Sequence, residues 1–123
     1  MRAKHGSVAE FLACQRVAVA SEMGRDAIMW RWVDVVTALA ALQSADECRA
    51  FLRDLCTPAE IQAMADRWSV VEFLQRGLPY REIHRLTGVS VTTIGRVARF
   101  LADGNGGYAV AVRRVGKEAS RHG

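Results

Sequence analysis

The four residues Thr87-Gly88-Val89-Ser90 constrain the fold of this chain more than any other short stretch. They separate two segments with the apolar spacing of a helix, one over 79–86 and one over 91–101. Gly88 can adopt the left-handed conformation that ends a helix, and the Ser90 hydroxyl can cap the helix that follows. The stretch therefore predicts two short helices joined by a three-residue turn.

Helix signals extend over most of the remaining chain. Ser7–Glu10 and Ser44–Glu47 have capping-box spacing, and Thr57–Glu60 adds a proline at the first helical position. Helices are expected over about 27–42 and from Thr57 to Gly77. Apolar residues recur in them every three to four positions, at Ile28, Trp32, Val35, Val36, Leu39 and Leu42 and, facing inward, at Ile61, Met64, Trp68, Val71 and Leu74. No segment alternates as a strand does, so the predicted fold class is all-α.

The domain organisation expected from these signals has three parts. Residues 1–25 form an N-terminal extension, either a helical or a flexible arm. Residues 26–110 form the helical domain, and 111–123 form a basic C-terminal tail. A chain of 123 residues fits one such domain, which can bury a core by itself or by pairing with a second copy.

Composition and charge exclude several classes of protein. No apolar stretch approaches the ~20 residues that a membrane span needs. The 3 cysteines form no C-x-x-C pair and have no histidine nearby, so neither a disulfide framework nor a zinc site is expected, and a reducing cytoplasm is the simpler setting. Residues 1–75 hold 8 Lys/Arg and 10 Asp/Glu, whereas 76–123 hold 9 and 3. A basic C-terminal half is typical of a nucleic-acid-binding protein.

The pair of short helices around Gly88 has the signature of a DNA-binding helix-turn-helix. Its packing requires apolar residues, which are present at Ile83, Val89, Ile94 and Val97. The first turn of such a second helix meets base edges, so the predicted base-reading residues are Val91, Thr92 and Thr93. Residues that flank the motif are predicted to contact the phosphate backbone, namely Arg81, His84, Arg85 and Ser90. The alternative interpretation is an ordinary α-hairpin in a helical bundle.

At these residues the sequence resembles the Trp repressor superfamily, and within it the YerC/YecD-type Trp-repressor-like proteins. Three motifs carry the resemblance: CTPAEIQA, then YREIHRLTGVSVTTIGRV, then R-V-x-R-x-L-x-x-GNGGY. It runs from about Trp32 to Tyr108. The resemblance implies an all-helical, intertwined homodimer that presents two recognition helices to a pseudo-palindromic site on double-stranded DNA.

The resemblance also identifies the positions of an effector site, namely Thr57, Arg67, Arg96, Val97 and Phe100. Tryptophan-sensing members hold the amino acid with two arginines, one threonine and small residues. Thr57, Arg67 and Arg96 retain the polar set, but Val97 and Phe100 replace a glycine and a serine. Because overfilling a close-packed site costs about 1–3 kcal/mol, we expect a filled pocket with no useful tryptophan binding. Arg67 and Arg96 are then expected to pair with Asp66 and Glu72 or to contact a phosphate.

The glycine-rich run 104–107 raises the possibility of a phosphate-binding loop. Such a loop lies between a strand and a helix N-terminus, where backbone N–H groups converge. Here the glycines follow a helix, so Asp103-Gly104 is predicted to be a helix stop, with Tyr108 anchoring the chain beyond it.

The sequence therefore favours a dimeric, sequence-specific DNA-binding transcriptional regulator, and the resemblance implies a repressor. A protein-interaction adaptor built on the same scaffold is the alternative. No nucleophile has a plausible activating base, so catalysis is not expected, and no metal or other cofactor is expected.

Overall fold

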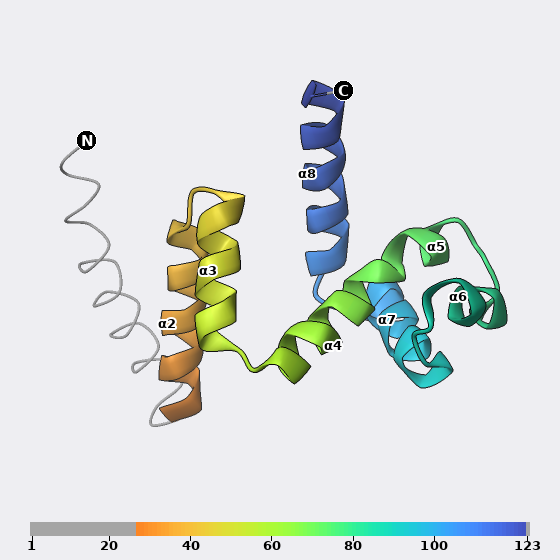
Figure 1. Cartoon of the computed structure of the whole chain (residues 1–123), viewed down its shortest axis with the longest axis horizontal. Helices are drawn as coiled ribbons and strands as arrows, with labels where there is room; N and C mark the ends of the chain where they lie inside the picture. Colours follow the sequence, from red (N-terminus) through yellow and green to blue (C-terminus); the bar gives the residue numbers. More distant parts are fainter. Residues whose placement is uncertain (1–26, 123) are drawn as a thin grey trace. The chain divides into compact units, whose positions relative to one another are not determined.

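The computed structural model describes residues 27–122, and this part of the chain contains helices and no strand (Figure 1). The helices are α2 (Ala27–Ala41), α3 (Ala45–Leu55), α4 (Pro58–Ser69), α5 (Val71–Gln75), α6 (Tyr80–Thr87), α7 (Val91–Asp103) and α8 (Gly107–His122). None of them is both long enough and apolar enough to cross a membrane. The all-α prediction is confirmed for these residues. The predicted capping box at 7–10 and the predicted extension over 1–25 lie outside them.

The chain divides into two compact units, Met1–Leu55 and Cys56–Gly123. The first unit contains α2 and α3, and the second contains α4 to α8. The expected division between 110 and 111 falls inside α8, because the basic C-terminal residues continue the helix that begins at Gly107.

In the first unit, the apolar stripe of α2 lies largely at the surface. Trp32, Val36 and Leu39 are 57%, 43% and 40% exposed. They follow one another at helical spacing and so share one face. Thr37 is buried on another face, where its hydroxyl donates to the Val33 carbonyl at 2.9 Å. The predicted periodicity is thus present, and Trp32, Val36 and Leu39 are its exposed members among the residues whose burial is described.

The second unit is built around α7, which contacts α4, α5, α6 and α8. Its core consists of small branched side chains from four successive segments: Val70, Val71, Ile83, Val89, Ile94 and Val97. Ile83 and Ile94 are fully buried, so they hold α6 against α7. Larger side chains surround this core, including Phe73, Leu74, Leu101 and Tyr108.

The single helix predicted from Thr57 to Gly77 is wrong in one respect. The structure has two helices there, α4 and the short α5, separated at Val70. The Ser69 hydroxyl donates back to the Asp66 carbonyl at 2.8 Å, a bond that competes with regular helix hydrogen bonding. The predicted inward direction of Trp68 is also wrong, since its side chain is 42% exposed.

The glycine-rich run behaves as a helix stop. α7 ends at Asp103, and α8 starts at Gly107. Only Gly106 in this run has a positive φ, of 81°. The Tyr108 ring packs against the core and stacks on Trp68 with 6.4 Å between ring centroids, which anchors the start of α8.

Candidate nucleic-acid interface

The connection between α6 and α7 has the predicted backbone geometry. Gly88 has a φ of 77°, and its N–H donates to the His84 carbonyl at 2.8 Å, which closes α6. Ser90 is the N-cap of α7, and its Oγ accepts the Thr93 N–H at 3.1 Å. The prediction of a helix stop at Gly88 and a helix cap at Ser90 is confirmed.

Two side chains on α6 secure this turn in a way that the sequence did not reveal. The Thr87 hydroxyl donates to the Ile83 carbonyl at 2.7 Å and accepts the Val89 N–H at 3.1 Å. His84 Nδ1 lies 2.7 Å from the Val89 carbonyl oxygen. Because a carbonyl can only accept, Nδ1 carries the proton and donates. Threonine before glycine was the available signal for the first contact, and none pointed to the second.

The three predicted base-reading residues differ in exposure. Val91 is 48% exposed and Thr92 is exposed, whereas Thr93 is half-buried. The hydroxyls of Thr93 and Ser90 are 3.0 Å apart and hydrogen-bonded, and the Thr93 N–H is the donor to the cap. Val91 and Thr92 are therefore open to a ligand, while the hydroxyls of Thr93 and Ser90 serve the first turn of α7.

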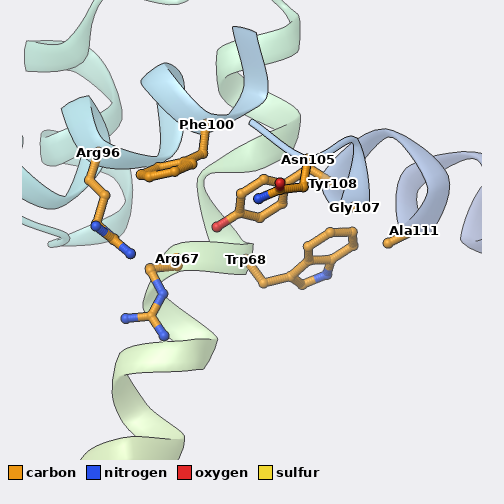
Figure 2. Close-up of a pocket in the computed structure, with 8 residues that line it drawn as sticks. All are labelled: Arg67, Trp68, Arg96, Phe100, Asn105, Gly107, Tyr108 and Ala111. Atoms are coloured by element: carbon orange, nitrogen blue, oxygen red, sulfur yellow. The ribbon is translucent and has the colours of Figure 1, made fainter. Parts of the chain in front are cut away.

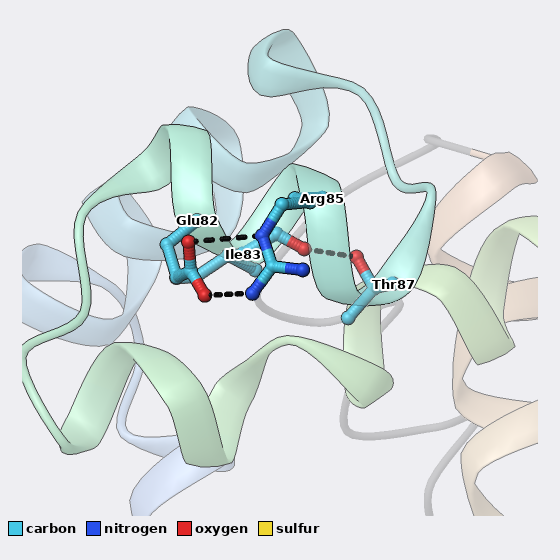
Figure 3. A network of polar contacts seen from close by, with 4 residues as sticks. All are labelled: Glu82, Ile83, Arg85 and Thr87. Carbon is cyan, nitrogen blue, oxygen red and sulfur yellow. Dashed lines mark hydrogen bonds and ion pairs between the residues drawn. The ribbon is translucent and has the colours of Figure 1, made fainter.

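The predicted backbone-contacting cations on α6 also differ. Arg81 is exposed, and no carboxylate of the described residues pairs with it. Arg85 is held by Glu82, which accepts from Arg85 Nε at 3.1 Å and from a terminal nitrogen (Figure 3). This hydrogen bond lowers the pKa of the Glu82 carboxyl and raises the pKa of Arg85. Arg81 is a free cation, whereas the charge of Arg85 is partly neutralised.

A cavity of about 520 Å³ lies elsewhere in the second unit, between α4, α7 and the start of α8. Arg67 and Arg96 lie on one side of it, and the Trp68 and Tyr108 rings on the other (Figure 2). Its lining is Arg67, Trp68, Arg96, Phe100, Asn105, Gly107, Tyr108 and Ala111. The structure thus brings together three of the predicted effector-site residues, Arg67, Arg96 and Phe100.

The other two predicted effector-site residues lie elsewhere. Thr57 caps α4, where its Oγ1 accepts the Glu60 N–H at 3.2 Å and Glu60 Oε1 accepts the Thr57 N–H at 2.8 Å. Val97 is 1% exposed and belongs to the core. Val97 therefore does not line the cavity, whereas Phe100 forms one wall of it. Sequence reasoning also missed Trp68, whose apolar spacing had indicated a core position.

The expected ion pairs of Arg67 and Arg96 are also absent from the described residues. Glu72 pairs instead with Arg76 at 2.5 Å, and Asp66 accepts from the Gln62 amide at 2.8 Å. Arg96 lies over the Phe100 ring, 4.9 Å from its centroid. Glu72 and Asp66 reach these partners because each pair is one helical turn apart. Arg67 and Arg96 therefore have no carboxylate partner among the described residues.

The described residues thus form an all-helical protein in which the capped N-terminus of α7 is exposed and Arg81 has no carboxylate partner. Comparison with known proteins gives the family: residues 30–116 match the family described as Trp repressor protein, and the chain belongs to it. It is similar to the "Uncharacterized protein YerC" of Bacillus subtilis (strain 168), with 42% identity over 78 residues. The alignment covers 63% of this chain and 75% of the relative. No solved structure matches the chain.

Proposed function

We propose that this chain is a sequence-specific double-stranded DNA-binding regulator of transcription that acts as a repressor, in which α6 and α7 act as a helix-turn-helix. The observation that carries the proposal is the start of α7. Ser90 caps this helix, Ile94 anchors it in the core, and Val91 and Thr92 remain exposed. A helix held in this way presents its first turn to the base edges of a major groove. Membership in the Trp repressor family supports the same function.

The residues take different roles in this proposal. The methyl groups of Val91 and Thr92 suit a thymine methyl, and the Thr92 hydroxyl can bond a base edge. Thr93 and Ser90 hold the first turn in place through their mutual hydrogen bonds. Arg81 binds one phosphate. Arg85 binds another while it keeps part of its contact with Glu82. Because Nδ1 of His84 donates in the turn, a phosphate contact through Nε2 requires the imidazolium form, in which both ring nitrogens donate.

We also propose that the regulator acts as a homodimer. The exposed stripe of Trp32, Val36 and Leu39 on α2 supports this, because a large apolar face at helical spacing is stable in water only when another surface covers it. Two copies related by a two-fold axis would present two α7 helices to a pseudo-palindromic site.

Tryptophan has no role in this proposal. Phe100 forms one wall of the cavity, and the Arg96 guanidinium is already stacked over its ring. An indole would have to compete for that contact. We therefore propose that the DNA affinity of the protein does not depend on tryptophan.

The proposal is tested by selecting binding sites from random duplexes and measuring affinity by fluorescence anisotropy. Replacing Thr92 by valine exchanges the hydroxyl for a methyl group of similar size, so it is expected to change the preferred base at one position, with discrimination altered by about ten-fold. Arg81→Ala is expected to weaken all duplexes alike and to reduce the salt dependence. The same titrations with added tryptophan should overlay those without it, and a mass measurement should give twice the chain mass.

Several results would contradict parts of this proposal. An absence of binding to any duplex, together with a stable complex with another protein, would favour the adaptor function instead. If Thr92→Val left every base preference unchanged while Thr93→Ala altered one, the assignment of the reading residue would be wrong. A monomeric mass would exclude the dimer, and a shift with tryptophan would restore an effector role.

A second prediction concerns the Glu82–Arg85 pair. Glu82→Gln removes a negative charge beside the proposed phosphate contact and weakens the hold on Arg85. It is expected to tighten binding to every duplex about three- to ten-fold at low salt. Glu72→Gln is the matched control, since Glu72 forms the same kind of exposed pair with Arg76 on another helix. Equal effects of the two substitutions would show that Arg85 does not lie at the interface.

A further inference from the structure

Three residues of α7 form a stripe along its exposed side. Thr92, Arg96 and Arg99 follow one another at i, i+4 and i+7, and the helix buries Ile94 and Val97 on the opposite side. All three are exposed. Gly95, between Thr92 and Arg96 in the sequence, lies outside this stripe, because it is half-buried beside the Tyr80 ring.

The two arginines of this stripe share one aromatic ring. The Arg96 guanidinium carbon is 4.9 Å from the centroid of Phe100, and that of Arg99 is 5.6 Å away. The positive charge of a guanidinium is attracted to the face of a ring at such distances. Phe100 thus holds the two flexible arginine side chains near one ring. They therefore lose less conformational entropy when they bind a ligand.

Both charges are available to that ligand. No carboxylate of the described residues pairs with Arg96 or Arg99. Asp103 lies one turn beyond Arg99, yet it forms no ion pair with it. By contrast, Arg76, which lies over the Phe73 ring at 5.9 Å, is neutralised by Glu72. The pair on Phe100 is therefore a concentrated, unpaired positive charge.

The positions of Arg96 and Arg99 along α7 can be compared with the width of a DNA major groove. At about 1.5 Å per residue, Arg96 lies about 6 Å and Arg99 about 10.5 Å along the helix from Thr92. A major groove is about 12 Å wide, so its edge is about 6 Å from its centre. When Thr92 meets base edges near the centre, Arg96 lies level with the groove edge, where the phosphates are, and Arg99 lies about 4.5 Å beyond it, a distance that an arginine side chain spans. Stacking on Phe100, which follows them in the helix, draws their heads away from the bases.

We propose that Arg96 and Arg99 bind the DNA backbone at the edge of the groove that Thr92 reads, and that Phe100 is the positioning residue for both. The inference rests on the proposed DNA-binding function. The ligand is a phosphate of the duplex rather than a small anion in the cavity, because Arg99 does not line that cavity and a ligand inside it would meet Arg67 and Arg96 but not Arg99. This role gives Phe100 a function in DNA affinity instead of one in filling an effector pocket.

The test measures the dissociation constant against salt concentration for a selected site and for a random duplex, using the full chain. Arg96→Ala and Arg99→Ala are each expected to weaken both duplexes roughly ten-fold at low salt. The magnitude of the salt slope should fall by about 0.9 for each phosphate contact that is lost. Arg76→Ala is the matched control, because it removes an arginine stacked on a ring outside α7, and it should change neither quantity.

The role of Phe100 is tested with a pair of variants. Phe100→Leu keeps both charges but removes the ring, so it should weaken both duplexes about two- to five-fold and leave the salt slope unchanged. Phe100→Tyr keeps the ring and should bind like the wild type. A thermal unfolding curve for each variant separates this effect from loss of fold.

Different failures point to different errors. If the wild type binds no duplex, the proposed function itself is wrong. If it binds DNA but the arginine variants bind equally well, the phosphate contact is wrong. A loss of affinity confined to sites with one particular base would also overturn the phosphate contact, since it would show that the arginines contact a base. If Phe100→Leu matches the wild type, Phe100 does not position the arginines.

Discussion

Replacing Ile94 by alanine is expected to lower the free energy of unfolding by about 2–5 kcal/mol. Ile94 lies on α7 and is fully buried against Ile83 and the other side chains of the core. The substitution removes three carbon atoms and leaves a cavity at the junction of α6 and α7, which small branched neighbours cannot fill. A urea unfolding curve followed by circular dichroism measures the change directly.

Val91→Ala is the control for this prediction. Val91 is on the same helix and also loses branched carbon atoms, but it is 48% exposed, so the free energy of unfolding should change by less than about 0.5 kcal/mol. Under the proposed function, the two substitutions separate stability from recognition, since Val91→Ala should alter base preference in a protein of normal stability. Equal unfolding midpoints for Ile94→Ala and the wild type would mean that this core does not hold the two helices together.

Replacing Gly88 by valine is the second substitution with a large expected effect. Gly88 has a φ of 77°, a conformation that costs an ordinary L residue about 1–2 kcal/mol and a β-branched one more. A Cβ at this position would meet nothing within 4 Å, so the cost comes from backbone strain alone and not from a clash. We expect a loss of about 1–3 kcal/mol in the free energy of unfolding. If the strain instead rotates α7, the loss in the free energy of DNA binding should exceed the loss in the free energy of unfolding.

Gly88→Asn provides the test of that cause. Asparagine tolerates the left-handed conformation better than other side chains, so it should retain most of the stability that valine loses. Calorimetric unfolding of both variants gives the comparison. If the asparagine and valine variants unfolded at the same temperature, the strain at Gly88 could not be the explanation.

Local signals in the sequence predicted the backbone of the second unit well. A glycine before Val89 and a serine after it mark a turn. The glycine lets the backbone close the first helix, and the serine side chain accepts a free N–H of the second, so neither depends on the rest of the fold. The Thr57–Glu60 capping box and the stop at Gly104 are confirmed for the same reason. The break at Val70 could not be predicted, because Ser69 can bond either backward to Asp66 or outward to water.

The candidate site was predicted only in part. Exposure at Val91 and Thr92 follows from helical periodicity, and so does the burial of Val97. The partners of the charged side chains do not follow from it. Asp66 and Glu72 were the candidate ion-pair partners of Arg67 and Arg96, with a phosphate contact as the alternative, yet they contact Gln62 and Arg76. On an exposed helix several partners lie within reach of each long side chain, and they differ little in free energy.

Periodicity, caps and turn residues in the sequence by themselves determined an all-helical chain, the α6–turn–α7 connection and the residues buried behind it. Each of these depends on contacts within one or two helical turns. Only the tertiary structure decided that Trp68 stacks on Tyr108, and that Arg67, Trp68 and Phe100 line one open cavity. Those arrangements depend on how α4, α7 and α8 pack and on which rotamers that packing leaves open, and no short stretch of sequence encodes either.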